Sequence, residues 1–121
     1  GVVPGQRVAL IANNDAARAT ARDLMAAGVK VVAILDTRPD AGAAEDCPVY
    51  LNARITGTAG RLGLSQVRFR HAGGEATLEV DTLAVSGGWN PTVHLTCHLN
   101  GRPVWRDDIA AFVPAANAAR G

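Results

Sequence analysis

The amino-acid sequence predicts an α/β fold in which a small parallel sheet carries an inserted three-stranded antiparallel meander. Three observations predict it. Residues 8–36 read as an apolar strand, a tight turn, an amphipathic helix and a second apolar strand. Residues 53–80 hold three strand-like runs divided by glycines. Residues 81–85 then form a last apolar run, which we expect to return to the parallel sheet.

In residues 8–35, the spacing of the apolar residues indicates first a strand, then a helix, then a second strand. Val8, Leu10 and Ile11 give the first apolar strand. Apolar residues three or four apart then mark one face of a helix. That stripe consists of Ala17, Ala21, Leu24 and Met25. Gly28 stands where a helix C-cap is expected, and the β-branched run after it predicts a second buried strand ending at Leu35.

The turn between the first strand and the helix has the spacing of a dinucleotide-binding motif without its usual glycines. If Ala12 takes the first glycine slot of G-x-G-x-x-G/A, Asn14 takes the second and Ala17 the third. Alanine is usual in the third slot, but a side chain in the second would crowd a pyrophosphate. Asparagine tolerates a left-handed backbone, so the turn can form. The spacing therefore predicts a Rossmann-like unit.

An acid closes this unit. Asp36 follows Ala12 by 24 residues, and the acid of this motif typically lies about 20 residues on and accepts hydrogen bonds from a ribose 2′-hydroxyl. A carboxylate there favours NAD over NADP, because it would repel a 2′-phosphate. Arg38 could instead pair with a phosphate or stack on an adenine. The alternative interpretation of Asp36 is a strand-end acid that starts the turn DTRPD.

The start of the helix is the expected pyrophosphate site, because its backbone amides and its dipole favour negative charge. Asp15 is a good N-cap that would compete for those amides. Asn13 or Asn14 could donate side-chain amide hydrogens to a phosphate, and Arg18 could add positive charge. A plain capping turn without a ligand is the alternative for residues 13–15.

The rest of the chain is rich in strand-like segments. Residues 39–46 predict a loop, and Pro48 to Leu51 a short strand. The meander strands are expected near residues 53–58, 64–71 and 75–80, with HAGGE as a hairpin turn. Gly87 and Gly88 follow the return strand, at the sheet end where ligands bind in such folds; a tight turn without contact is the alternative. We expect one domain, divided into a βαβ core (1–51), a β-meander (52–80), a return strand (81–91) and a tail (92–121).

Composition and sequence exclude several classes of function. The formal net charge is only +1 and no basic patch with aromatics occurs, which argues against nucleic acid as a partner. No apolar run is long enough to predict a membrane span. Cys47 and Cys97 lack metal-ligand spacing and fit a reducing cytoplasm, and VHLTCH does not favour a metal site. Ser86 does not lie in a hydrolase elbow motif. The Ala, Gly and Arg bias hints at a bacterial source.

A second motif carries a resemblance to a known family. In DTLAVSGGWNP, an acid begins a buried strand that ends in small-x-Gly-x-x-Pro, as in the return strand of pyridine-nucleotide-disulfide oxidoreductases. The opening GVVPGQRVALIANNDAARATARDL, the DTRP after the second strand, LAVSGGWNPTVHL and GRPVWRDDIAAFVP together resemble the alpha subunits of heterotetrameric sarcosine oxidases. The resemblance spans nearly the whole chain and is weakest between residues 40 and 80.

The resemblance implies a noncovalent NAD in this domain, with the NND turn of the family at Asn13, Asn14 and Asp15 and the ribose-binding acid at Asp36. It also implies that FAD, FMN and tetrahydrofolate are bound elsewhere in a complex of alpha, beta, gamma and delta subunits. We expect this chain to be an excerpt of an alpha subunit, with its tail directed toward a missing flavin domain. We expect it to be inactive alone in amine oxidation.

Three functions stay open from the sequence. The first is an NAD-binding domain of a sarcosine oxidase alpha subunit. The second is a scaffold or interaction domain that has kept the fold but lost nucleotide affinity, because an asparagine replaces a glycine and Asp15 caps the helix. The third is the equivalent domain of another amine-, opine- or proline-oxidising flavoprotein subunit.

Overall fold

The computed structural model describes residues 2–44, 46–98, 100–109 and 111–115. The chain forms two compact units, Gly1–Gly88 and Trp89–Gly121, and each is described by itself. The boundary between them falls inside the stretch 81–91 that the sequence assigns to the return strand.

A four-stranded parallel sheet is the centre of the first unit. Its strands are β1 (Arg7–Ala12), β2 (Lys30–Asp36), β3 (Val49–Tyr50) and β7 (Thr82–Ser86), in the spatial order β3-β2-β1-β7. Helix α1 (Ala16–Ala26) connects β1 to β2, which pair in parallel. The predicted βαβ unit is therefore present, and the return strand β7 pairs in parallel with β1 as the sequence indicates. The fold class predicted from the sequence is confirmed.

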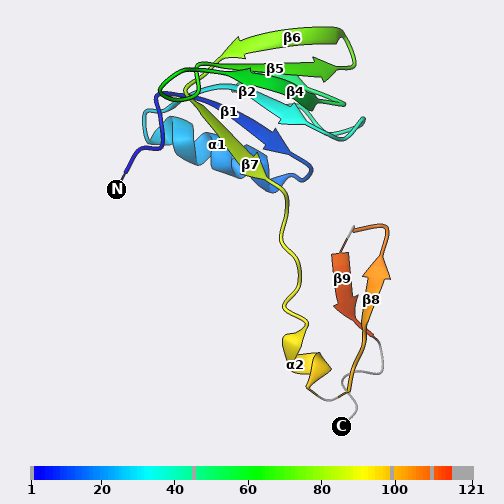
Figure 1. The fold of residues 1–121 in the computed structure, drawn as a ribbon. Coiled ribbons are helices and arrows are strands. Elements are labelled where there is room, and N and C mark those ends of the chain that lie inside the picture. The colour runs from blue at the N-terminus through cyan, green and yellow to red at the C-terminus, as the bar shows by residue number, and fades with distance from the viewer. Residues whose placement is uncertain (1, 45, 99, 110, 116–121) are drawn as a thin grey trace. The chain divides into compact units, whose positions relative to one another are not determined.

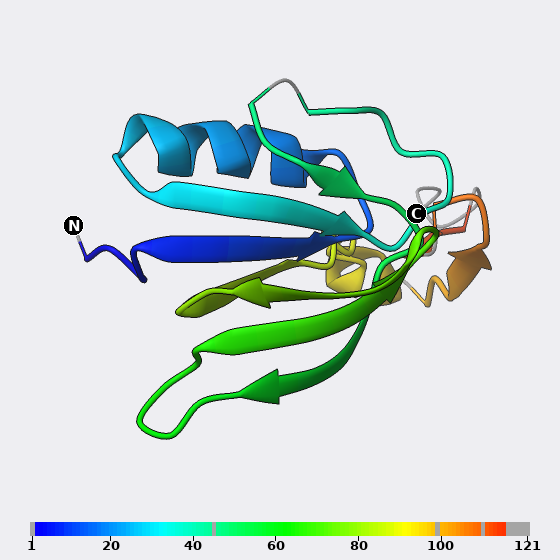
Figure 2. The same ribbon diagram turned by 90° about the horizontal axis from the view of Figure 1, so that it is seen from above.

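Helix α1 and the meander cover opposite faces of the parallel sheet (Figures 1 and 2). Successive residues of β1 alternate between them: Leu10 packs with the helix, and Ala9 packs with the meander. On the helix, Ala17 and Ala21 are buried, while Leu24 and Met25 are half-buried against the same cluster. The apolar stripe read from the sequence is thus the face that α1 turns to the sheet.

The meander consists of β4 (Arg54–Ala59), β5 (Gln66–His71) and β6 (Gly74–Glu79), paired antiparallel in chain order. Its central strand has the predicted alternation, because Val67 and Phe69 are fully buried while Arg68 and Arg70 are exposed. The buried pair packs on Ala9, Ala33, Leu35, Ala53 and Val80. The meander therefore supplies the second half of the core of this unit.

The ends of α1 and β2 show why the chain turns where it does. Gly28 has φ +83°, and the amides of Gly28 and Val29 donate to the carbonyls of Met25 and Leu24. This pair of hydrogen bonds is a Schellman motif, which favours glycine at the left-handed position. Between β2 and β3, no helix occurs in the described residues of 37–48, as the sequence predicts for so short a connection.

His71, the last residue of β5, packs against two aromatic rings. Its ring is half-buried and lies 4.8 Å from the ring of Tyr50 and 5.5 Å from that of Phe69, between centroids. Its Nδ1 also accepts a hydrogen bond from the Gly73 amide at 3.1 Å. The hairpin brings His71 back beside β3, a pairing between distant segments that local sequence does not reveal.

The second unit contains helix α2 (His94–Cys97) and a hairpin of β8 (Pro103–Arg106) and β9 (Ala111–Pro114). The sequence interpretation left this region as a tail and missed the hairpin. Trp105 and Phe112 face each other across it, with ring centroids 5.1 Å apart. Trp89 and Trp105 are both exposed, at 94% and 47% of their surface. In the described residues, no helix has the length and apolar character to cross a membrane.

Candidate functional site

The carboxyl ends of β1, β2 and β7 meet at one edge of the parallel sheet. Ala12 is the register partner of Asp36 on one side and of Ser86 on the other. The amide of Thr37 also donates to the carbonyl of Ala12 at 2.8 Å. Ligands of open α/β sheets bind outside this edge. The topology thus brings the predicted turn, the predicted acid and the glycines after β7 into one place.

The glycine-poor turn forms without a left-handed residue, because Asn13 and Asn14 both have negative φ. The amide of Asn13 donates to the Ser86 carbonyl at 3.3 Å, which ties the turn to β7. The side-chain amide of Asn14 donates to that same carbonyl at 2.9 Å and to Asn13 Oδ1 at 2.9 Å. The Asn14 side chain therefore folds back on β7, and its two amide hydrogens are already used. Of the two asparagines, the exposed Asn13 is the one with an amide left for a phosphate.

Asp15 does not cap the helix with its side chain, so that prediction was wrong. Asn14 Oδ1 instead accepts the hydrogen bond from the Ala16 amide at 3.0 Å. The carboxylate of Asp15 is drawn to two guanidinium groups, Arg18 at 3.0 Å and Arg38 at 2.7 Å. Charge-assisted hydrogen bonds of this kind are stronger than a neutral cap. In the described part of the chain, the backbone amides of Asn14 and Asp15 meet no acceptor, which leaves them available to an anion.

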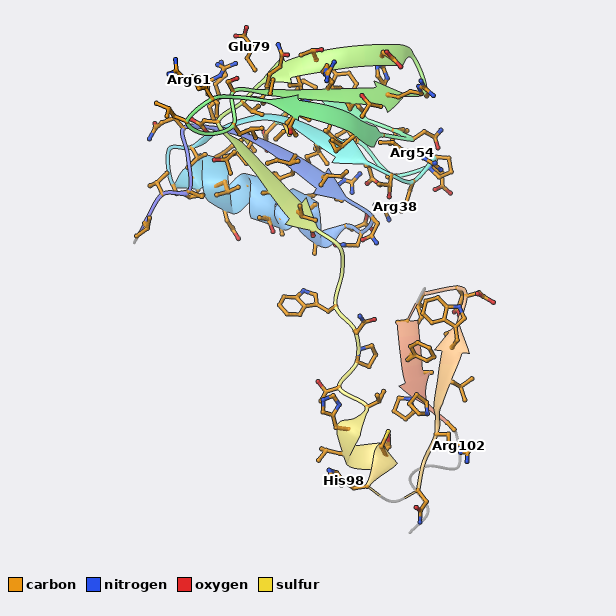
Figure 3. All side chains as sticks on the ribbon, in the orientation of Figure 1. Arg38, Arg54, Arg61, Glu79, His98 and Arg102 are labelled. Carbon is orange, nitrogen blue, oxygen red and sulfur yellow. The ribbon has the colours of Figure 1, made fainter. Side chains whose placement is uncertain are left out.

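Asp15, Arg18, Asp36 and Arg38 form a cluster of two acids and two bases, which we call the four-charge cluster. Arg38 holds Asp36 as a fork, with Nε donating to Oδ1 at 3.0 Å and Nη2 donating to Oδ2 at 2.9 Å. Its backbone amide donates to Oδ1 as well, at 3.0 Å. Arg18 lies 3.7 Å from Asp36 Oδ2 and also donates to the Gly42 carbonyl. Figure 3 labels Arg38 at this edge of the sheet.

Asp36 is completely buried, and the four-charge cluster keeps it ionised. Burial acts to raise its pKa, but the hydrogen bonds and positive charges of Arg38 and Arg18 outweigh burial and hold the pKa below its ordinary value. Arg38 likewise lowers the pKa of Asp15, and the two acids raise the pKa of Arg38. Asp15, Asp36 and Arg38 are therefore charged at neutral pH, and the formal charges of the four side chains sum to zero.

The two glycines after β7 differ in their surroundings. Gly88 has φ +84°, and a side chain there would come 3.6 Å from Asn14 Nδ2 and 3.7 Å from Asn13 Oδ1. Gly87 has open space where a side chain would start. Gly88 thus lies directly beside the turn, which fits a ligand that approaches the backbone closely at this point.

The cavity next to the site is small. With a volume of about 170 Å³, it lies beside the four-charge cluster, between α1 and the loop after β2. It is lined by Arg18, Ala21, Arg22, Met25, Ala43, Ala44, Asp46 and Cys47. A larger cavity of about 490 Å³ lies at the opposite end of β1, beside Arg7 and Asp81. Burial raises the pKa of the Cys47 thiol, which makes it a poor nucleophile.

The sequence analysis named most residues of this site, but not the hydrogen bonds and ion pairs that join them. It named both Asp36 and Arg38, but it assigned Arg38 to a phosphate or an adenine and did not foresee that its guanidinium pairs with Asp36. It did not foresee that Arg18 reaches Asp36 or that the Ser86 carbonyl anchors both asparagines. The signal available was the position of Arg18 one turn into α1, on the side that faces β2. In the described residues, no group of three or more His, Cys, Asp or Glu side chains could hold a metal ion.

The four-charge cluster predicts a specific loss of stability in acid. Because the folded-state pKa of Asp36 lies below its unfolded value, the cluster stabilises the fold fully above the unfolded pKa. That stability is lost as the pH falls through the folded pKa. We expect the free energy of unfolding to drop by about 1–3 kcal/mol on acidification below about pH 4. Urea unfolding at a series of pH values measures this, and the decline should be shallower in Asp36→Asn. An equally steep decline in the variant would contradict the assignment.

Comparison with known proteins identifies relatives of the whole chain. No protein-family model matches it. The sarcosine oxidase subunit alpha of Rhizobium meliloti is 43% identical over 115 residues, which cover 93% of this chain. That of Corynebacterium sp. strain P-1 is 37% identical over 98% of this chain. The chain spans only 12% and 14% of the lengths of these two relatives.

Solved structures confirm the fold. Bacillithiol disulfide reductase from Staphylococcus aureus has a TM-score of 0.67 at 16% identity, over 93% of this chain and 38% of its own. L-proline dehydrogenase from P. horikoshii has a TM-score of 0.58 at 16% identity, over 94% of this chain and 18% of its own. At these identities, the similarity supports a shared Rossmann-like α/β fold and nothing finer. By sequence, the chain matches a short segment of the sarcosine oxidase alpha subunits, which confirms the resemblance noted in its motifs.

Proposed function

We propose that this chain is the NAD-binding domain of a sarcosine oxidase alpha subunit. One observation carries the proposal. The start of α1, with two backbone amides that meet no acceptor in the described residues, lies beside a buried ionised acid at the end of the neighbouring strand β2. This arrangement provides donors for a pyrophosphate and an acceptor for a ribose, side by side.

The residues present fit a dinucleotide. The amides of Asn14 and Asp15 and the side-chain amide of Asn13 would hold the pyrophosphate, and Gly88 would let the backbone approach it. Asp36 would accept from the adenine-side ribose. When bound, NAD would supply hydride-transfer chemistry, and the residues of this chain would only bind and orient it. The folded-back Asn14 removes the steric objection to a side chain in the second glycine slot.

The charge balance of the site supports NAD over NADP. A 2′-phosphate needs positive charge in excess. Arg18 and Arg38 provide two positive charges, but Asp15 and Asp36 neutralise both at distances of 2.7–3.7 Å. A 2′-phosphate would bring negative charge next to the Asp36 carboxylate where no positive charge is in excess to balance it, whereas a 2′-hydroxyl would donate to the carboxylate.

The role of the parent protein follows from its relatives and is part of this proposal. The complex would oxidise sarcosine to glycine with folate-linked one-carbon transfer, using FAD, FMN and tetrahydrofolate bound outside this chain. The partners would be the remainder of the alpha subunit and the beta, gamma and delta subunits, in the bacterial cytoplasm. This chain alone would then be inactive in amine oxidation.

A scaffold domain without nucleotide affinity is the second candidate. One observation favours it: both oxygens of Asp36 already accept hydrogen bonds from Arg38, so a ribose would have to compete with this guanidinium.

A titration of the ¹⁵N-labelled chain with NAD⁺, followed by NMR, separates the two candidates. We expect chemical-shift changes concentrated at residues 13–18 and 36–38, because these residues form the site. Smaller changes are expected with NADP⁺ at equal concentration. No shift change at millimolar NAD⁺ would overturn NAD binding by this chain and favour the scaffold.

A further inference from the structure

Arg38 occupies the position that a bound nucleotide would need. Its Nη2 donates to Asp36 Oδ2 at 2.9 Å and to Asp15 Oδ1 at 2.7 Å, so the guanidinium bridges β2 and the start of α1. A dinucleotide that runs from the amides at the start of α1 to Asp36 must cross this bridge. The closed arrangement and the bound arrangement therefore exclude each other.

The side chains of the four-charge cluster differ in their exposure to solvent. Asp36 is fully buried, whereas the Arg38 side chain is 31% exposed and that of Asp15 is 77% exposed. The Arg38 side chain is thus more exposed to solvent than the acid that it holds. Arg18, whose side chain is only 13% exposed, lies deeper and stays close to Asp36 Oδ2 at 3.7 Å.

Asp36 would not be left without partners if the Arg38 side chain moved away. The backbone amide of Arg38 would still donate to Oδ1, and Arg18 would still supply positive charge next to Oδ2. The outward movement exposes the two acceptor sites that Nε and Nη2 now fill. A ribose with two hydroxyls can fill both.

We propose that the Arg38 side chain is a latch that closes the ribose site and must leave Asp36 before a dinucleotide binds. This inference rests on the proposed NAD site and adds that the Arg38 guanidinium competes with the ribose for Asp36. Binding then exchanges the guanidinium–carboxylate fork for ribose hydroxyl bonds, while Arg18 and the Arg38 backbone amide stay in place. Only molecules with the latch open can bind, so the apparent affinity for NAD⁺ is the intrinsic affinity multiplied by the open fraction.

Removal of the latch tests this directly. Arg38→Ala should bind NAD⁺ about three- to tenfold more tightly than the unmodified chain, because none of its molecules is held in the closed arrangement. Arg38→Lys should also bind more tightly, since lysine keeps the charge but lacks the planar fork. Arg22→Ala is the matched control, an exposed arginine of α1 outside the four-charge cluster, and should leave the affinity unchanged. Isothermal titration with NAD⁺ measures all four proteins.

A second readout follows the Arg38 side chain itself. In the ligand-free chain, its Nε–H should exchange slowly with solvent because it is bound to Asp36, and saturating NAD⁺ should remove this protection. Equal or weaker NAD⁺ binding by Arg38→Ala, or an Nε–H still protected at saturation, would overturn the latch and leave the NAD site intact. Absence of NAD⁺ binding by every variant would overturn the proposed function and the latch together, whereas binding by Arg38→Ala alone would support the latch and overturn NAD⁺ binding by the unmodified chain.

Discussion

Replacement of Asp36 by asparagine is expected to weaken NAD⁺ binding by about tenfold or more, because an ionised acceptor contributes more to a hydrogen bond than a neutral amide. The same change should shift preference toward NADP⁺. Loss of one negative charge leaves the four-charge cluster with a net charge of +1, and the repulsion of a 2′-phosphate disappears. Titration of NAD⁺ and NADP⁺ against the same preparation measures the ratio of the two affinities.

Asp23→Asn is the charge-matched control for this experiment. Asp23 is an exposed acid on α1 outside the four-charge cluster, so its neutralisation should change neither affinity. Circular dichroism must show that Asp36→Asn retains its fold, since this residue is buried. If Asp36→Asn bound NAD⁺ as well as the unmodified chain did and still rejected NADP⁺, the assignment of Asp36 to the ribose would be wrong.

Phe69→Ala is expected to give the largest loss of stability, about 3–5 kcal/mol in the free energy of unfolding. Phe69 is fully buried on β5, where the meander packs on β1 and β2. Its ring also lies 5.0 Å from that of Tyr50 on β3, between centroids. Truncation leaves a cavity between the two sheets and removes an edge-to-face aromatic pair. Urea unfolding followed by circular dichroism measures the loss.

Leu62→Ala provides the comparison, because Leu62 is a large apolar residue that is fully exposed in the loop between β4 and β5. Its truncation should change stability by less than about 0.5 kcal/mol. A similar effect of the two substitutions would show that the meander does not share a core with the parallel sheet.

The sequence was sufficient to predict the fold of the first unit because each element there has its own local period. The alternation of Val67 and Phe69 with arginines, the stripe on α1 and Gly28 at its end all act within a few residues. The hairpin of the second unit was missed because its strands are four residues each and mostly exposed. Strands of that kind leave almost no apolar alternation to detect.

At the site, sequence could not show which side chains from different elements contact one another. The motif spacing predicted an acid at the end of β2, but not the pairing of Asp36 with Arg38. The capping role of Asp15 was predicted from local propensity, and it failed because tertiary structure places two guanidinium groups beside that carboxylate. The approach of Arg18 to Asp36 depends on how α1 packs against β2, which no local pattern specifies.

A crystal structure of this chain with NAD⁺ would test the central claim most directly. We expect an adenine-side ribose within hydrogen-bond distance of Asp36, a pyrophosphate at the amides of Asn14 and Asp15, and the Arg38 guanidinium displaced from Asp36. A nucleotide bound elsewhere, or a ribose that leaves the contact between Arg38 and Asp36 intact, would contradict it.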